Sequence, residues 1–512
     1  MEDTNSQSQS HYYVYLGWAF VSLVLLATFR RWTAASNGLR LPPGPWKLPI
    51  IGSLHHLLGQ LPHRALRELA RRHGPVMLLQ LGELPTLVIS TPEAAREVMK
   101  THDLTFSARP LTAVIRVLSN DGRDIAFAPY GEHWRQLRKI AVTELLTTSR
   151  VLTFRSIRQE EVMSMMHEVG SAAAATGEVE MRDRITALIA NSTFRAVMGD
   201  RCKQRDLFLR GVEEVIALAT GFNAADMWPS WSWIAGRLSN DMRRAEEVAN
   251  TLFKMFGGII EEHLERMKDG ERESLDLVDV LLKIHKEGGV DLVSIKSVVF
   301  DVFIAGSETT ATALEWALSE LIKHPAAMKK ATAEVRKAFA ATGKVLEERI
   351  SAELPYLHLV IRETFRLHPP LPLLLPRICR ESCKVLGFDV PKGTQVIVNA
   401  WALSRDEKHW PEATEEFWPE RFEEGTPAAT VDFRGTDYEF LPFGAGRRMC
   451  PGISFGLASL ELPLASLLFH FDWESAEVSD PTELDMTEAY GVTARRKNNF
   501  PVRPTLRMPL PV

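Results

Sequence analysis

The sequence predicts a mainly α-helical protein with small β-sheets and one N-terminal transmembrane helix. Apolar residues recur at helical spacing through most of the 512-residue chain. Only two stretches, 76–90 and 385–403, have the pattern of paired strands. One uncharged apolar run near the N-terminus is long enough to cross a bilayer as a helix.

The anchor is predicted from residues 12–29, which carry no charge and place Tyr and Trp toward the start of the run, where they suit a membrane interface. Arg30 and Arg31 follow, whereas the few charges before the run are acidic. The positive-inside rule therefore places the rest of a single-pass chain in the cytosol. A cleaved signal peptide processed at 34–36 is the competing interpretation, but no basic region precedes the run.

Pro42, Pro43 and Pro45 follow the anchor and exclude a helix there. We expect this segment to end the anchor helix and to orient the globular part against the membrane. The predicted organisation is an anchor at 1–33, a basic, proline-rich hinge at 34–47 and one large domain at 48–512.

The large domain is predicted element by element from its apolar spacing. Residues 76–90 form a hairpin around a Gly82–Glu83 turn, and 385–403 form a second strand pair around 391–393. A charged stretch at 270–273 is expected to be exposed. Helices are expected at 61–73, 94–101, 134–146, 248–268, 301–322 and 354–367.

Composition limits the function classes. The chain is 45% hydrophobic and 24% charged with a formal net charge of −5, which is ordinary globular composition and gives no basic excess for nucleic acid. The spacing of Cys379 and Cys383 would suit a metal pair on a helix, but the strand-like residues that follow favour a structural role. We expect neither a zinc site nor a disulfide framework from the four cysteines, Cys202, Cys379, Cys383 and Cys450.

The loop at 443–452 carries the chemistry. Its glycines allow the backbone to approach a cofactor closely, and its free N–H groups can point at the sulfur of Cys450. Arg448 beside the thiol is expected to favour the thiolate, which is the form that binds metal. These features suit a Cys-ligated haem. A tight glycine-rich turn with a buried free cysteine is the alternative.

This loop resembles the haem-binding loop of the cytochrome P450 family, Phe-x-x-Gly-x-Arg-x-Cys-x-Gly, at Phe443, Gly446, Arg448, Cys450 and Gly452. The resemblance implies the cytochrome P450 fold, an α-rich triangular prism with haem between two central helices. It implies heme b (iron protoporphyrin IX) as cofactor and Cys450 as the iron ligand. The resemblance extends along essentially the whole chain and is strongest to the plant microsomal branch.

The centre of the helix at 301–322 reads Ala-Gly-Ser-Glu-Thr-Thr. Small residues there leave room for a flat ligand, and Thr309 can donate a hydrogen bond to a carbonyl of the preceding turn. This sequence is similar to the oxygen-binding motif of the family, which implies that Glu308 and Thr309 deliver protons and that Ala305 lies against the haem. The alternative is a solvated stripe, because Asp301, Glu308 and Glu315 recur every seven residues.

Two further motifs resemble family patterns. Glu363 and Arg366 share a helix face and can pair, and the resemblance adds Arg421 as a third member of a structural clamp. Trp134 and Arg138 also face one way and carry donors suited to a carboxylate. A plain amphipathic helix is the alternative there. The resemblance assigns the haem propionates to Trp134, Arg138, Arg377 and Arg448.

Apolar segments predict a small hydrophobic substrate. The proline- and leucine-rich stretch 368–375 cannot be helical, and the resemblance places it over the haem. The resemblance adds 107–128, 302–309 and 490–492 as further walls.

The predicted function is a haem-thiolate monooxygenase that oxidises a plant metabolite with O₂, at the endoplasmic reticulum membrane. A terpenoid is the first expected substrate, and an indole-derived or phenolic metabolite is the next. The sequence carries no nucleotide-binding glycine loop, so electrons are expected from NADPH through a cytochrome P450 reductase, docked near Arg135, Lys139 and Arg447. A haem-thiolate isomerase or dehydratase that needs no NADPH is the alternative enzyme, and a haem sensor is the alternative outside catalysis.

Overall fold

The structure is a computed structural model that describes residues 15, 18, 22, 38–201, 204–219, 223–268 and 276–510. The predicted anchor at 1–33 therefore lies outside the described residues, apart from Tyr15, Trp18 and Ser22. Cys202 and the charged stretch at 270–273 lie outside them as well.

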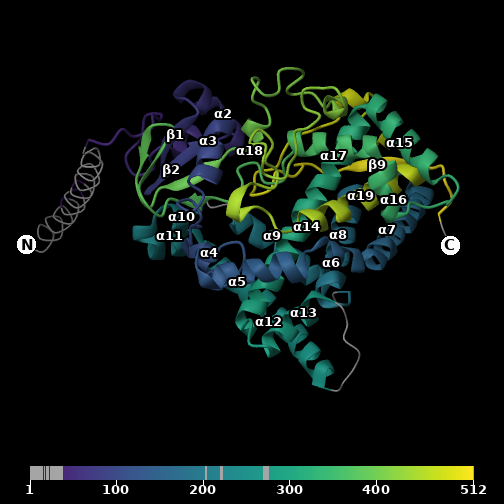
Figure 1. The fold of residues 1–512 in the computed structure, drawn as a ribbon, viewed down its shortest axis with the longest axis horizontal. Coiled ribbons are helices and arrows are strands. Elements are labelled where there is room, and N and C mark those ends of the chain that lie inside the picture. Colours follow the sequence, from purple (N-terminus) through teal and green to yellow (C-terminus); the bar gives the residue numbers. More distant parts are fainter. Residues whose placement is uncertain are drawn as a thin grey trace, which may run out of the picture.

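The described chain is rich in helices, which Figure 1 shows packed around a centre formed by α14 and α19. The helices are α2 Pro62–His73, α3 Pro92–Arg96, α4 Ala113–Leu118, α5 Glu132–Ile140, α6 Thr148–Thr153, α7 Arg155–Thr176, α8 Met181–Met198, α9 Arg205–Leu218, α10 Ala224–Met227, α11 Ser232–Ser239, α12 Asp241–Lys268, α13 Leu277–Lys286, α14 Leu292–Lys323, α15 Pro325–Phe339, α16 Glu347–Glu353, α17 Pro355–Leu367, α18 Ala400–Leu403 and α19 Ile453–His470. Short 3-10 or π segments are η1 Leu54–His56, η2 Glu97–Thr101, η3 Ala141–Leu145, η4 Pro229–Trp231, η5 Pro419–Phe422, η6 Gly446–Arg448 and η7 Pro481–Glu483.

Three small sheets complete the fold of the described residues. Their orders are β1-β2-β7-β4, β3-β9-β8 and β5-β6. The strands are β1 Val76–Leu81, β2 Leu84–Ile89, β3 Val179–Glu180, β4 Arg377–Ile378, β5 Cys383–Val385, β6 Phe388–Val390, β7 Gln395–Val398, β8 Phe471–Ser475 and β9 Pro501–Leu506.

The central helix α14 begins nine residues before the predicted start at Asp301. Asp291 caps it by accepting the backbone N–H of Ser294 at 2.8 Å, so the first turn is satisfied at Leu292. Most of its residues are buried against α8 and α19. Among the described residues, α19 is the one helix long and apolar enough to cross a membrane, but 67% of it is buried, as expected of a core helix.

The predicted hairpin at 76–90 is confirmed. β1 and β2 pair antiparallel, and Gly82 supplies the positive φ of +59° that the turn between them requires. Leu87 and Ile89 on one face of β2 and Val88 on the other are all fully buried, so this strand packs against apolar clusters on both faces.

The prediction of a strand pair around 391–393 was wrong in its pairing. Strands do flank this turn, but β6 pairs with β5, whereas β7 inserts between β2 and β4 in another sheet. The tight hairpin turn lies instead at Leu386–Gly387, where both residues have positive φ. Sheet pairing is non-local, so the local pattern located the strands but not their partners.

The proline-rich segment packs against the first sheet. The N–H of Leu78 in β1 donates to the carbonyl of Pro43 at 2.8 Å, and a Cβ at Gly44 would collide with the carbonyl oxygen of Leu78. The N–H of Asp389 likewise donates to the carbonyl of Arg40 at 2.8 Å. The segment is non-helical, as expected, and its C-terminal half is joined to the large domain.

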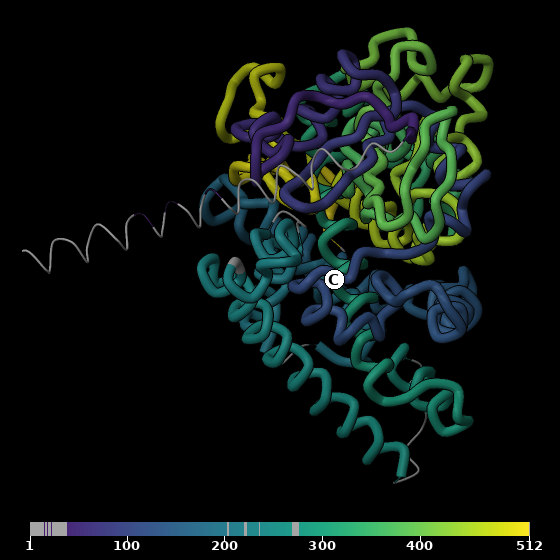
Figure 2. The backbone as a smooth tube through the Cα atoms, turned by 90° about the vertical axis from the view of Figure 1, so that its left-hand side faces the viewer, coloured from purple at the N-terminus to yellow at the C-terminus, as the bar shows by residue number. Residues whose placement is uncertain are grey.

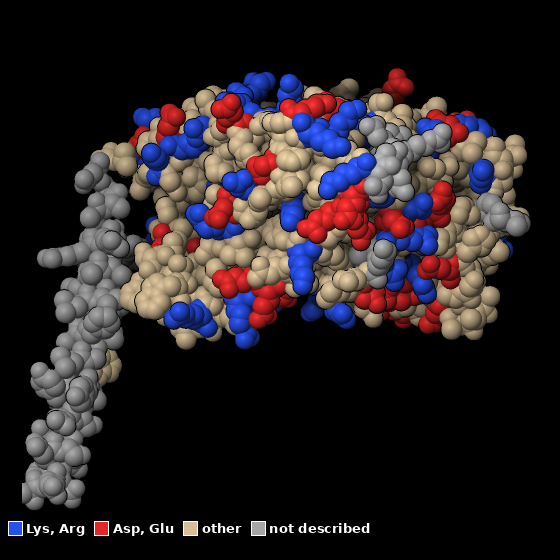
Figure 3. Space-filling model, turned by 90° about the horizontal axis from the view of Figure 1, so that it is seen from below, with Lys and Arg blue, Asp and Glu red and all other residues tan. Residues whose placement is uncertain are grey.

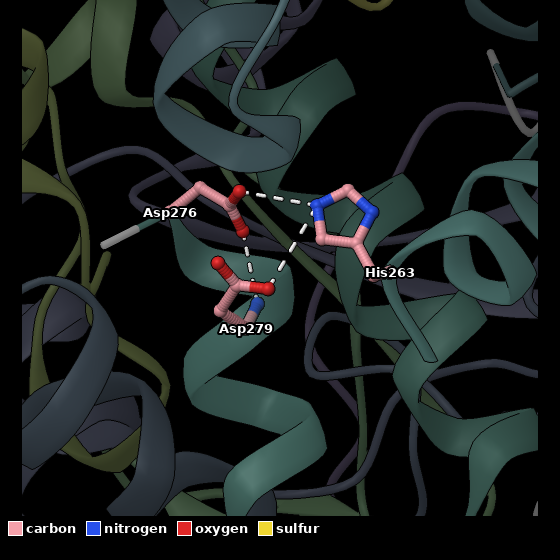
Figure 4. Close-up of side chains that lie close together, drawn as sticks. All are labelled: His263, Asp276 and Asp279. Atoms are coloured by element: carbon pink, nitrogen blue, oxygen red, sulfur yellow. Dashed lines mark hydrogen bonds and ion pairs between the residues drawn. The ribbon is translucent and has the colours of Figure 1, made fainter. Parts of the chain in front are cut away.

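α12 and α13 project beyond the rest of the domain (Figure 2) and are joined by a buried cluster (Figure 4). The Nδ1 of His263 lies 2.8 Å from the carbonyl oxygen of Ile259, which can only accept, so Nδ1 is the donor. Its Nε2 then faces Asp276 at 3.1 Å and Asp279 at 4.0 Å. Burial lowers the pKa of His263, but the hydrogen bond and charge of Asp276 outweigh burial and raise it overall. The cluster thus favours the protonated form of His263, next to the residue that caps α13.

Candidate active site

The cysteine loop takes a shape that only glycine permits at Gly446. This residue has a φ of +70°, and a Cβ on it would collide with the carbonyl oxygen of Met99 and lie 2.6 Å from Oδ1 of Asp103. The loop closes when the N–H of Cys450 donates to the carbonyl of Phe443 at 3.0 Å. One loop N–H, that of Gly452, points at the Cys450 sulfur at 3.3 Å, as the sequence predicted.

Arg448, which the sequence analysis placed beside the thiol, uses its guanidinium in other hydrogen bonds. Burial raises the pKa of Cys450, and the opposing influences are the Gly452 N–H and the charge of Arg138. The guanidinium of Arg448 turns away, because the η6 turn directs it toward the carbonyls of Ser107, at 2.8 Å, and Ala128, at 2.6 Å. Two positions of separation along an irregular turn do not fix which way a side chain points.

A cavity with a volume of about 250 Å³ lies beside the sulfur of Cys450. Predicted site residues that line it are Trp134, Arg138, Ala305, Thr309, Arg377, Phe443, Arg448, Cys450 and Gly452. The cavity therefore gathers most of the predicted site from four separate parts of the chain.

The centre of α14 forms one wall of this cavity. Ala305 is exposed to it, and Gly306 leaves space in front of Phe455. The hydroxyl of Thr309 donates to the carbonyl of Ala305 at 2.6 Å, which is the hydrogen bond predicted from the sequence.

Glu308 does not line the cavity. Its Oε1 accepts a hydrogen bond from the hydroxyl of Thr493 at 3.0 Å, on the side of α14 that faces the C-terminal segment. Burial raises the pKa of Glu308, and the nearby charge of Arg495 opposes this rise. The two residues assigned to proton delivery thus occupy different surroundings.

The alternative of a solvated acidic stripe along α14 was wrong. Asp301 accepts two backbone N–H groups, and Glu315, 4% exposed, accepts from Nε of Arg182 at 3.0 Å. Glu308 bonds to Thr493, so each of the three acids, Asp301, Glu308 and Glu315, has a hydrogen-bond partner inside the protein.

The predicted propionate donors differ in how free they are. The guanidinium of Arg138 makes no hydrogen bond or ion pair with any described residue. The Nη2 of Arg377 donates to the carbonyl of Ala445 at 2.8 Å, while its buried Nη1 has no hydrogen-bond partner among the described residues and lies 3.5 Å from Asp103. The indole N–H of Trp134 is used by the carbonyl of Ile125 at 3.1 Å.

Arg109 is a cavity residue that the sequence analysis missed. Its Nη1 donates to the carbonyls of Leu375 and Pro376, and its buried Nε has no described partner. Burial, followed by repulsion from Arg377 and Arg448, holds the pKa of Arg109 well below its usual value. Arg109 is one of two arginines, with Arg116, in the otherwise uncharged stretch 106–118, and this was the available signal.

The cavity fits an anionic, flat, metal-containing cofactor. Arg109, Arg138, Arg377 and Arg448 line it, whereas Asp301 is the one carboxylate among the lining residues. A buried excess of positive charge calls for anionic groups on the ligand. A thiol beside the same space supplies a soft metal ligand. Haem, with two propionates and iron, meets both conditions.

The predicted clamp is fully buried away from the cavity. The Glu363 carboxylate accepts from Nε and Nη2 of Arg366, each at 2.8 Å, and from Nε of Arg421 at 3.0 Å. Glu363 and Arg366 are both 0% exposed. These three residues join α17 to the irregular segment around η5.

Cys379 and Cys383 lie at a short strand, not on a helix. Cys383 begins β5, and Cys379 is buried with its thiol against the carbonyl of Glu381 at 2.9 Å. Burial raises the pKa of Cys379 to about 12. This is the structural arrangement that the sequence favoured.

Apolar side chains line part of the cavity. Leu371, Leu374 and Leu375 line it, together with Val302 of α14 and Ile125. The predicted wall at 490–492 lines a neighbouring cavity instead, and this neighbour shares Leu374 and Leu375 with the first. Leu374 adopts a left-handed backbone with φ of +51°, which is uncommon for a branched residue.

Comparison with known proteins agrees with a haem site in this cavity. The sequence profile described as Cytochrome P450 matches residues 42–501. Desmethyl-deoxy-podophyllotoxin synthase of Sinopodophyllum hexandrum is 44% identical over 94% of this chain and 95% of its own length. Dolabradiene monooxygenase of Zea mays is 44% identical over 96% and 98%. A zebra fish cytochrome P450 structure with abiraterone superimposes with a TM-score of 0.73 at 26% identity, over 87% of this chain and 99% of that one.

The fold, the cysteine loop and the matched sequence length agree. The chain belongs to the cytochrome P450 family, a family of haem-iron monooxygenases.

Proposed function

We propose that this chain is a membrane-anchored haem-thiolate monooxygenase of a small hydrophobic plant metabolite, with a terpenoid as the first candidate. The observation that carries the proposal is the cavity itself. It joins the sulfur of Cys450, arginine side chains with unused donors and an apolar wall in one cavity.

Cys450 is the proposed iron ligand of heme b. When bound, haem supplies the oxygen-activating redox chemistry. Arg138, whose guanidinium has no described partner, and Arg377, whose Nη1 makes no hydrogen bond, are the proposed donors to its two propionates, and Arg109 is a further candidate. The Gly452 N–H would hold the sulfur in place and temper its charge.

Thr309 is the proposed proton-handling residue at the cavity. Its hydroxyl donates to the carbonyl of Ala305, so it can exchange that bond for one to a water or substrate oxygen. Glu308 would act from behind α14. Its raised pKa keeps more of the carboxyl protonated near neutral pH, where it can hold a proton.

A terpenoid substrate is supported by the walls and by one relative. The walls are mainly aliphatic, with Leu371, Leu374 and Val302 facing the space above α14. A Zea mays relative is named for oxygenation of dolabradiene, a terpenoid. The podophyllotoxin name of the other relative keeps an aromatic metabolite as the second candidate.

Electrons would come from NADPH through a reductase that docks near the cysteine loop. Arg135 and Arg447 are exposed and both lie 6.0 Å from the ring of Tyr130, and Arg380 lies 5.3 Å from it. Three cations around one ring make a basic surface beside the loop of Cys450, which suits an acidic partner.

The test compares Cys450→Ala with Cys383→Ala in the purified full-length protein. We expect Cys383→Ala to keep the red-shifted absorption of the reduced carbon monoxide complex and Cys450→Ala to lose it. Turnover of a terpenoid and aromatic library should require both NADPH and reductase. Product formed without NADPH would favour an isomerase or dehydratase. Haem held normally in Cys450→Ala would refute the ligand assignment.

A further inference from the structure

Asp301 of α14 is the one acid among the residues that line the cavity, and the proposed chemistry does not use it. It lines the cavity one turn before Ala305. Its Oδ2 accepts the backbone N–H of Ile125 at 2.7 Å and that of Ala126 at 2.9 Å. Ile125 and Ala126 themselves line the cavity. One carboxylate oxygen therefore fixes the backbone of the opposite wall.

The carbonyls of the same wall are held from two other directions. Those of Ile125 and Ala128 accept from Arg448 at 3.3 and 2.6 Å, and that of Ile125 also accepts from the indole of Trp134. The segment 124–128 is thus a junction. Its N–H groups bind α14, and its carbonyls bind the cysteine loop and α5.

The junction contains a second buried acid. Asp124 is 1% exposed and accepts the N–H of Phe127 at 2.9 Å, which shapes the turn of the segment. Burial raises the pKa of Asp301 to about 6, although the two N–H bonds favour its charged form. Charged groups are costly in such a place unless they are bonded, so the bonds to Ile125 and Ala126 account for the position of Asp301.

We propose that Asp301 is a positioning residue that holds the 124–128 wall against α14 and thereby fixes the orientation of the substrate. Only the second part of this inference, that the wall orients the substrate, rests on the proposed function. The hydrogen-bonded link itself is a property of the fold. Loosening the wall would displace Ile125, which lines the cavity, whereas the hydrogen bond of Thr309 to Ala305 and the closure of the cysteine loop by the Cys450 N–H involve no residue of the wall.

The first experiment measures hydrogen exchange in the peptide that contains 124–128, using the full-length holoprotein. Asp301→Ala leaves two N–H groups without an acceptor, so we expect protection to fall roughly tenfold or more. Asp301→Asn keeps an oxygen acceptor, so the protection of this peptide should fall less in that variant. Glu315→Gln is the matched control, because it removes another buried charge from α14 and should leave the peptide unchanged.

The second experiment measures the ratio of product regioisomers and the KM and kcat for the substrate found in the library screen. We expect Asp301→Ala to change the ratio by roughly tenfold, because small displacements of a bound substrate have large effects on reaction geometry. Asp301→Asn should give a regioisomer ratio closer to that of the wild type. Glu315→Gln should keep the wild-type ratio.

The outcomes separate the two proposals. Unchanged exchange in Asp301→Ala refutes the positioning role, whatever the enzyme does. Faster exchange with an unchanged regioisomer ratio also refutes it, since the wall would then not orient the substrate. Faster exchange in a protein that needs no NADPH would leave the wall link standing and overturn the proposed monooxygenase function.

Discussion

Thr309 and Glu308 show how much a single helical step changes the surroundings of a side chain. Successive residues on a helix point about 100° apart, so Thr309 reaches the cavity while Glu308 reaches Thr493. Their roles should therefore be separable by mutation. A proton held by Glu308 would have to pass along the backbone of α14 or through water to reach Thr309.

Thr309→Ala should uncouple the reaction. The variant keeps the cysteine loop, so the reduced carbon monoxide spectrum should be unchanged. We expect the fraction of NADPH that ends in product to fall about tenfold or more, with hydrogen peroxide rising in its place, because a positioned proton donor is worth about 10²–10⁴ in rate. The measurement is NADPH consumed against product and peroxide formed.

Thr309→Ser is the control, since it keeps the hydroxyl that donates to Ala305. Its coupling should stay close to that of the wild type. Fully coupled product formation by Thr309→Ala would show that the proton reaches the site by another route.

At the scale of elements, the clamp of Glu363 joins α17 to the irregular chain around η5. One buried carboxylate serves two arginines, so Glu363→Gln leaves two buried cations with no counter-charge. Breaking a buried pair in this way costs about 3–5 kcal/mol. We expect that loss in the free energy of unfolding, measured by urea titration.

Glu353→Gln is the matched control for the clamp. Glu353 pairs with Arg349 at 2.6 Å on the neighbouring helix α16, but both side chains are about one-third exposed. Such a pair contributes about 1 kcal/mol or less. Equal losses for the two variants would contradict the clamp assignment.

The stability of the contact between α12 and α13 should depend on pH. The pKa of His263 is raised in the folded protein, so its bond to Asp276 contributes stability fully below the unfolded value, near 6.5. That contribution is lost as pH rises through the folded value. We expect His263→Gln to cost on the order of 1–2 kcal/mol at pH 6 and clearly less at pH 9.

The measurement is the free energy of unfolding of His263→Gln and of wild type at both pH values. His358→Gln is the control, since its pair with Glu461 is longer, at 3.5 Å, and more exposed. A cost of His263→Gln that grows with pH would show that the imidazole is neutral in the folded protein.

At the scale of the whole molecule, one end of the domain carries large exposed apolar residues. Trp231 and Trp233 lie at α11, and Trp46 and Ile50 belong to the segment that precedes α2. The indole of Trp228 donates to the carbonyl of Ile50, which ties the two regions together. Figure 3 shows a broad uncharged surface at the same end of the molecule as α10 and α11 in Figure 1.

We expect this surface to lie against the membrane. A chain that lacks the proposed anchor, residues 1–33, should still sediment in part with liposomes. Trp233→Asp in that chain should weaken binding roughly tenfold or more, because burying one large apolar side chain contributes about 1.5–3 kcal/mol. Leu152→Asp, which alters an exposed leucine on α6, should have no effect.

Loss of all liposome binding on removal of 1–33 would show that the anchor alone holds the protein to the membrane. Equal effects of Trp233→Asp and Leu152→Asp would show that the α11 surface is not the contact.

Periodicity located some helices better than others, and the long helices α12 and α14 begin seven and nine residues before their expected starts. α2 and α17 begin within one residue of their expected starts, and the β1–β2 hairpin has the expected turn. Pairing of β7 was missed because its partners come from distant parts of the chain. The helix caps, such as Asp291, were missed because the pattern of apolar residues alone does not mark them.

The site was predictable as a set of residues but not as a geometry. The motifs named Cys450 and Thr309, which the fold brings to one cavity. The direction of Arg448 and the position of Glu308 depend on backbone details of a turn and a helix face. Arg109 has no repeating pattern around it, so its place in the cavity emerges only when the chain is folded.

The backbone contact at Gly446 has a consequence for recombination between related genes. Met99 presses against this glycine, and Asp103 accepts the N–H of Arg447 at 3.2 Å and pairs with Arg377. Three short stretches, more than 340 positions apart at their extremes, are therefore structurally coupled. A chimaera that draws them from different parents has to keep them mutually compatible, however well the exchanged blocks match elsewhere.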